Sequence, residues 1–169
     1  MIHALQTLLL LIFPLLVIAA ALRDATSYTI PNWLSLVLVA AFPVAALALG
    51  LPLPTIGLNF AIGAAALVAG IGMFALGWIG GGDAKLFAAA AVWLGWAPSI
   101  TYLAVTGLAG GALAMGLLAL RSAHIRPFIP AGPAWFARLV EPGENVPYGV
   151  AIAVGALAAF PASALMNHL

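Results

Sequence analysis

Cysteine is absent from this sequence, and charged side chains are rare. Of the 169 residues, five are Lys or Arg and four are Asp or Glu, so 5% are charged, against roughly 25% in an ordinary soluble domain. Without cysteine there is no disulfide, no thiolate zinc site and no cysteine nucleophile. A net charge of +1 offers no basic face for nucleic acid. The three histidines lie far apart in the sequence, which argues against a metal cluster. We expect neither a metal nor a cofactor.

Apolar residues, in contrast, make up 66% of the sequence. Crossing a bilayer takes about 20 mostly apolar residues. These runs predict an all-α, polytopic membrane protein with about six transmembrane helices. Residues 1–169 are expected to form one membrane-embedded domain with no separate soluble domain. The runs are bounded by charge, Pro or Gly and cover approximately residues 3–22, 32–50, 56–79, 84–97, 99–120 and 147–166.

The positive charges predict how the helices are oriented. They fall only in the first, third and fifth loops, and positively charged short loops stay in the cytoplasm. Both termini are therefore expected outside the cytoplasmic (inner) membrane, with every Asp and Glu on the inner side. The residues concerned are Arg23, Lys85, Arg121, Arg126 and Arg138.

Two further features concern the membrane surface. Trp33, Trp78, Trp93 and Trp96 lie near the ends of apolar runs, where indole rings favour the headgroup region, so we predict that they anchor the helices. The polar segment 121–146 carries apolar residues at helical spacing. It forms either an interfacial helix that lies on the membrane or an ordinary loop with a few buried anchors.

Asp24 and Asp83 are the only aspartates, and both flank apolar runs on the predicted cytoplasmic side, Asp24 after the first and Asp83 before the fourth. Ionisable groups at membrane depth are costly and usually functional. Aspartic hydrolysis needs two facing carboxylates that share one proton, so that one activates water while the other protonates the tetrahedral oxygen. The alternative is that both are surface carboxylates, with Asp24 beside Arg23 and Asp83 near Lys85.

Three glycines, Gly80, Gly81 and Gly82, directly precede Asp83. Glycine permits tightly turned backbone and the close approach of a second chain, which an extended substrate beside a nucleophilic water requires. The same residues also fit a plain turn in which Asp83 is the N-cap of the next helix.

Three motifs, in the right order, resemble those of one family. Gly80–Leu86 fits the pattern G-x-G-D-x-K-L. The step from Asp24 to Pro31-Asn32 resembles the first aspartate motif of type IV prepilin peptidases, and Pro147-Tyr148-Gly149 resembles their P-[YF]-G segment. The sequence is therefore similar to these G-x-G-D membrane aspartic peptidases, in particular to the short forms of tight-adherence (Flp) pilus systems.

This resemblance implies an aspartic endopeptidase that removes the leader peptide of type IV or Flp prepilins or pseudopilins at the cytoplasmic face. The family typically cleaves after a Gly just before the hydrophobic pilin helix. Asp24 and Asp83 carry over as the catalytic pair. The expected partners are the prepilin, through its leader and its hydrophobic helix, and membrane lipid. The residues expected to bind substrate or shape the site are Gly80, Gly81, Gly82, Lys85, Pro147, Tyr148 and Gly149.

Other functions use the same residues. A small ion-coupled transporter or proton channel would employ Asp24 and Asp83 as intramembrane relay groups, although such proteins more often show paired broken helices, and the glycines before Asp83 mark only one. A non-catalytic pilus assembly scaffold would tolerate the loss of either aspartate. Lys85 either marks the cytoplasmic side or binds a lipid phosphate, a substrate acid or a neighbouring helix.

Overall fold

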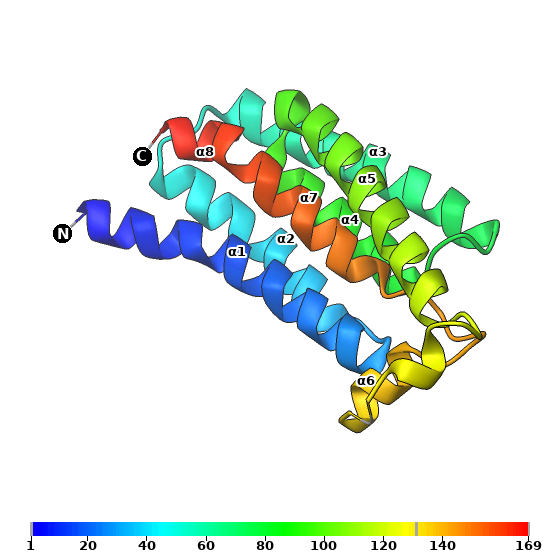
Figure 1. Ribbon diagram of the computed structural model, residues 1–169. Helices are drawn as coiled ribbons and strands as arrows, with labels where there is room; N and C mark the ends of the chain where they lie inside the picture. Colours follow the sequence, from blue (N-terminus) through cyan, green and yellow to red (C-terminus); the bar gives the residue numbers. More distant parts are fainter. Residues whose placement is uncertain (1, 131, 169) are drawn as a thin grey trace.

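The computed structural model describes residues 2–130 and 132–168, and within these ranges the chain is helical, without a strand. The long helices lie side by side, and α6 lies beyond one end of the bundle (Figure 1). The predicted all-α fold is therefore confirmed. The helices are α1 (Ile2–Ser27), α2 (Asn32–Ala48), α3 (Leu53–Ala75), α4 (Gly81–Leu94), α5 (Trp96–Leu120), α6 (Ala134–Leu139), α7 (Tyr148–Ala159) and α8 (Ala164–Asn167), with short 3-10 turns at Arg126–Phe128 and Phe160–Ala162.

Four helical stretches are long and apolar enough to cross a membrane, which makes the chain a multi-pass membrane protein. The last of them combines α7, a 3-10 turn and α8. By contrast, α2 has 17 residues and α4 has 14, fewer than the about 20 that a crossing usually needs. Helix length thus supports four of the six predicted crossings. The four stretches are His3–Ser27, Leu53–Ala75, Trp96–Leu120 and Tyr148–Asn167.

The short helix α4 runs through the middle of the bundle. The helices α1, α2, α3 and α7 pack against it, and every residue from Asp83 to Leu94 except Lys85 is buried. Residues 88–91 are four consecutive alanines, and such small side chains let neighbouring helices approach closely. Because protein surrounds α4, its ends need not reach the membrane surfaces.

An aromatic cluster closes the bundle at the end of α4 far from Asp83. The ring of Trp93 lies 5.4 Å from Phe13, 5.9 Å from Phe42 and 6.4 Å from Phe160, measured between ring centroids. Its indole N–H donates a hydrogen bond of 2.8 Å to the carbonyl of residue 38, which satisfies the one polar group of the side chain. The other three rings carry no polar atom.

Burial also tests the predicted tryptophan anchors. The prediction is wrong for Trp93, which is fully buried, because the apolar run that it terminates is the central helix. Trp33, Trp78 and Trp96 are each more than half exposed, as expected for rings that contact lipid or headgroups.

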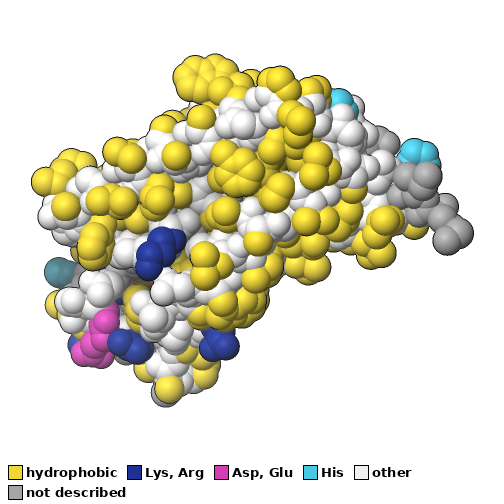
Figure 2. Space-filling model, turned by 180° about the vertical axis from the view of Figure 1, so that it is seen from behind, with side chains coloured by type: hydrophobic (Ala, Val, Ile, Leu, Met, Phe, Trp, Pro, Cys, Tyr) yellow, Lys and Arg dark blue, Asp and Glu magenta, His cyan; other side chains and the backbone are white. Residues whose placement is uncertain are grey.

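Charged side chains gather at the end of the bundle where α6 lies. On the face shown in Figure 2, Lys, Arg, Asp and Glu lie toward one end, and hydrophobic side chains cover most of the remaining surface. The beginning of α1 and the short helix α8 lie at the opposite end (Figure 1). The ends of α1 and α5 and the beginnings of α2, α4 and α7 therefore meet at the charged end.

The end of α1 differs from the prediction. The helix continues to Ser27, so Asp24 lies within its last turns rather than in a loop after it. The hydroxyls of Thr26 and Ser27 donate to carbonyls one turn earlier, over 2.7 and 2.6 Å. The helix stops at Tyr28, whose φ of +52° is left-handed. The helix thus continues past the apolar run, and its polar side chains there find hydrogen-bond partners on the helix backbone itself.

Candidate active site

Asp24 is fixed by the beginning of α7. Its side chain is buried, and its Oδ2 accepts a hydrogen bond of 2.7 Å from the backbone N–H of Gly149. Gly149 is the second residue of α7, and N–H groups in the first turn of a helix have no partner within the helix. The Pro147-Tyr148-Gly149 motif therefore supplies a donor to the first aspartate.

Asp83 lies in the first turn of α4, where Gly80, not Asp83, is the N-cap. The N-cap interpretation is thus wrong by three positions. Oδ2 of Asp83 accepts from the N–H of Gly80 over 3.0 Å. Its Oδ1 is buried and has no hydrogen-bond partner among the described residues. A buried carboxylate oxygen without a partner is costly, so it is available for a water, a proton or a substrate group.

Two cavities bring the aspartates together. The first, here called the loop-side cavity, has a volume of about 260 Å³ and extends from both aspartates to Trp78, Asn145 and Tyr148. The second, the α2-side cavity, has a volume of about 540 Å³ and extends to Asn32 and Lys85. Asp24 and Asp83 line both cavities.

The three sequence motifs meet at Ile30. A Cβ atom on Gly82 would lie 3.1 Å from the Cβ of Ile30, and one on Gly149 would lie 2.8 Å from its Cδ1 and 2.8 Å from Oδ2 of Asp24. These positions therefore require glycine because of close packing. Gly80 and Gly81 also line the α2-side cavity, where Gly81 packs on Phe74.

Of the remaining predicted residues, Lys85 and Tyr148 border the cavities and Pro147 does not. Lys85 Nζ donates to Oδ1 of Asn32 over 2.8 Å, so the side chain binds a neighbouring helix. Pro147 is buried at the N-cap of α7. Tyr148 lines the loop-side cavity, and its ring packs on Gly110 of α5.

Tyr28 is a site residue that the sequence did not single out. It lines both cavities, and its N–H donates to the carbonyl of Asp24 over 2.8 Å. Burial raises the pKa of Tyr28, and the nearby Arg121 and Arg138 only partly oppose this effect. The phenol therefore stays protonated at neutral pH and remains a donor.

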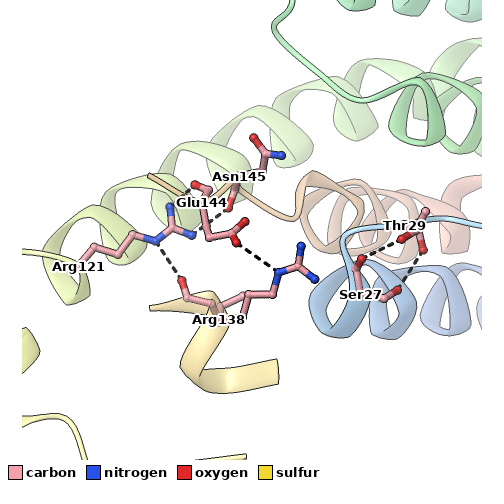
Figure 3. Close-up of polar contacts among 7 residues, drawn as sticks. Ser27, Thr29, Arg121, Arg138, Glu144 and Asn145 are labelled. Atoms are coloured by element: carbon pink, nitrogen blue, oxygen red, sulfur yellow. Dashed lines mark hydrogen bonds and ion pairs between the residues drawn. The ribbon is translucent and has the colours of Figure 1, made fainter. Parts of the chain in front are cut away.

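Arg121 is a second residue that sequence reasoning assigned only to topology. Its guanidinium donates three hydrogen bonds to the carbonyls of Leu139, Glu144 and Asn145, over 2.9, 2.7 and 2.8 Å (Figure 3). Arg138 binds Oε1 of Glu144 over 3.3 Å. Arg121 thus holds both ends of the segment 139–145, which leads directly into the motif that fixes Asp24.

The chemistry available to this arrangement is acid–base chemistry. Each aspartate has one oxygen bound by a backbone N–H, and the pair shares two cavities. Within residues 2–130 and 132–168, no three His, Asp or Glu side chains come together as a metal site would require. A carboxylate pair of this kind can take a proton from water with one member while the other donates one.

A helical membrane bundle with two buried carboxylates at its charged end belongs to the class of membrane proteins that can perform acid–base chemistry. Comparison of the sequence with protein-family models is more specific: residues 11–115 match the type IV leader peptidase family. The chain belongs to this family, which confirms the resemblance seen in the motifs. The matched range includes Asp24 and Asp83 and ends before Pro147. No curated protein and no solved structure matches the chain.

Family membership gives the general function of the molecule. It is a protease of the prepilin leader peptidase type, its substrates are prepilins, and it is a multi-pass protein of the inner membrane.

Proposed function

We propose that this protein is an aspartic endopeptidase that removes the leader peptide of type IV or Flp prepilins or pseudopilins, with Asp24 and Asp83 as the catalytic residues. One observation carries the proposal: α1 and α4 bring the only two aspartates of the chain to the same two cavities. Two facing carboxylates that share one proton are the arrangement that aspartic proteases use to hydrolyse a peptide bond with water.

In the reaction, the ionised carboxylate takes a proton from a water molecule. At the same time the oxygen of this water attacks the scissile carbonyl carbon. The protonated carboxylate gives its proton to the carbonyl oxygen, which yields a neutral tetrahedral diol. The second carboxylate then takes a proton from a diol hydroxyl as the C–N bond breaks, and the amide nitrogen leaves with the proton that the first carboxylate had accepted. This yields a carboxylic acid and an amine and restores the singly protonated pair. The N–H groups of Gly149 and Gly80 hold one oxygen of each aspartate throughout.

The substrate would lie extended across the pair. The loop-side and α2-side cavities open on either side of the aspartates, and Gly80, Gly81 and Gly82 place no side chain between them. The N–H groups of Gly81 and Gly82 lie in the first turn of α4, where they have no partner within the helix, and would pair with an extended peptide as in other strand-like recognition.

The proposed topology has six helices in the membrane, both termini outside and the aspartates at the cytoplasmic face. The charged end of the bundle supports this orientation because Lys and Arg favour the inner side. In this arrangement α4 begins below the inner surface: its 14 residues span about 21 Å, against a hydrocarbon core of about 30 Å.

Conservative substitutions test the proposal. In purified protein, Asp24→Asn and Asp83→Asn should each lower the rate of prepilin cleavage by about 10²–10⁴-fold, because an amide keeps the shape but cannot exchange the proton. Wild-type activity should fall at both low and high pH, since the singly protonated pair is active. Glu141→Gln, which alters only a surface ion pair with Arg126, serves as the control and should cleave normally.

Near wild-type cleavage by either well-expressed Asn variant would reject the two-aspartate mechanism. A pilus assembly scaffold, or a transporter that uses the same acids, would then become the better interpretation.

A further inference from the structure

An apolar groove begins beside the catalytic cavities. It has a volume of about 490 Å³ and is lined by α2, α3 and α4. Asn32 and Lys85, joined by their hydrogen bond, line both this groove and the α2-side cavity. The two spaces therefore share one rim, with the polar aspartate site on one side and the apolar groove on the other.

The residues of the groove have helical spacing on all three helices. From α4 they are Lys85, Ala88, Ala89 and Val92, which follow one another as i, i+3, i+4 and i+7 and so share one face. The same spacing begins at Asn32 in α2 and at Phe60 in α3. Each stripe is about 10 Å long. Three such stripes around one groove form a surface into which the ridge of a further helix can pack.

Small side chains form part of this surface. Gly63, Ala64, Ala88 and Ala89 all line the groove, and residues of this size let helix backbones approach closely in a membrane. Ser35 also lines it, and its buried hydroxyl has no hydrogen-bond partner among the described residues. In an apolar setting an unpaired hydroxyl can bond to the backbone of an incoming helix.

The groove is open toward the lipid. Both α2 and α3 pack against α4 but make few backbone contacts with each other, and groove residues on these two helices, among them Leu36, Ala64 and Leu67, are exposed. A helix in the bilayer can therefore reach the groove from the side, without passing through the charged end of the bundle.

We propose that this groove seats the hydrophobic helix of the prepilin, on the mature side of the cleaved bond. The inference rests on the proposed function. A substrate that is cut just before an apolar helix must pass from the aspartates directly onto an apolar surface. The helix α4 provides both parts, because it carries Asp83 in its first turn and the floor of the groove along the turns that follow.

Filling the groove tests the proposal with two substrates, a full-length prepilin and a short peptide that ends a few residues after the cleaved bond. Ala64 is exposed within the groove, so Ala64→Phe should lower kcat/KM for the prepilin by about tenfold or more. Cleavage of the short peptide should stay at the wild-type rate, because that peptide lacks the helix.

Two control variants place the same phenyl ring outside the groove. Ala104→Phe adds it to an exposed position of α5, and Gly107→Phe adds it to a second apolar cavity lined by α3, α4, α5, α7 and the loop residue Ile79. Both should cleave the prepilin normally. Normal prepilin cleavage by Ala64→Phe, or a selective loss in Gly107→Phe, would overturn the proposal. Failure of the wild type to cut either substrate would instead contradict the proposed function.

Photocrosslinking covers the case in which Ala64→Phe harms folding and both substrates are lost. A photoreactive side chain at position 64 of the full-length protein, in vesicles with an uncleaved prepilin, should crosslink to the mature helix. The same side chain at position 104 should not. Crosslinks to phospholipid alone would assign the groove to a lipid and overturn the proposal.

Discussion

At Gly149 the backbone of α7 comes so close to Asp24 that only a hydrogen atom fits on the α-carbon. The N–H of this residue holds the carboxylate, while its missing side chain leaves space for Ile30 and for the carboxylate oxygen itself. The requirement for glycine is thus steric. Gly149 both donates the hydrogen bond to Asp24 and packs against Ile30, so a substitution at this position changes both interactions.

This residue gives a sharp prediction. Gly149→Ala should displace Asp24 or Ile30 and lower kcat by about a hundredfold, since a catalytic group moved by about 1 Å can cost that much. Gly116→Ala is the matched control because a Cβ there meets nothing within 4 Å. Initial rates on a prepilin substrate, with thermal unfolding of both variants, provide the measurement. Equal rates for the two variants would contradict the geometry described for Asp24.

At the scale of the element, the segment 139–145 is held by one side chain from another helix. Arg121 ends α5 as its C-cap and donates to three carbonyls of this segment. Asn145, the last residue of the segment, and Val146, which follows it, line the loop-side cavity. The planar guanidinium matches several acceptors at fixed angles in a way that an ammonium group cannot.

We therefore expect Arg121→Lys to keep the topology but to lower kcat/KM by about tenfold, because several charge-assisted hydrogen bonds are lost together. The segment 139–145 should also become accessible to limited proteolysis. Arg126→Lys is the control, since Arg126 pairs only with Glu141 at the surface. If Arg121→Lys cleaves as fast as this control, Arg121 has no role in positioning the cavity wall.

The elements also show how far the sequence could predict the structure. Apolar runs predicted the helices, and the glycines before Asp83 predicted a displaced helix start, because both depend on local composition. Tyr28 and Arg121 were missed, since their roles come from a left-handed backbone without glycine and from backbone acceptors far along the chain. In segment 121–146, the choice between interfacial helix and loop was left open. In the part of this segment that the structure describes, there is a 3-10 turn at Arg126–Phe128 and the six-residue α6, followed by a buried Val140.

At the scale of the molecule, the absence of cysteine makes the proposed orientation easy to test. Asn167 and Ala123 are exposed at opposite ends of the bundle. In intact cells, Asn167→Cys should react with a membrane-impermeant thiol reagent and Ala123→Cys should not, while the cysteine-free wild type gives no background. Both variants should react once the membrane is permeabilised. Labelling of Ala123→Cys alone would reverse the proposed topology.

The aromatic cluster around Trp93 has a consequence for the energy balance of the cell. Hydrolysis needs water at the aspartates, and water within a membrane protein often carries protons. Here the cavities lie at the charged end, while the rings of Phe13, Phe42 and Phe160 surround Trp93 at the other end of α4. Proton wires need chains of polar groups, and the one polar group of these four rings, the indole N–H of Trp93, is bound to a backbone carbonyl. The molecule can thus admit its reactant from one compartment without draining the proton-motive force.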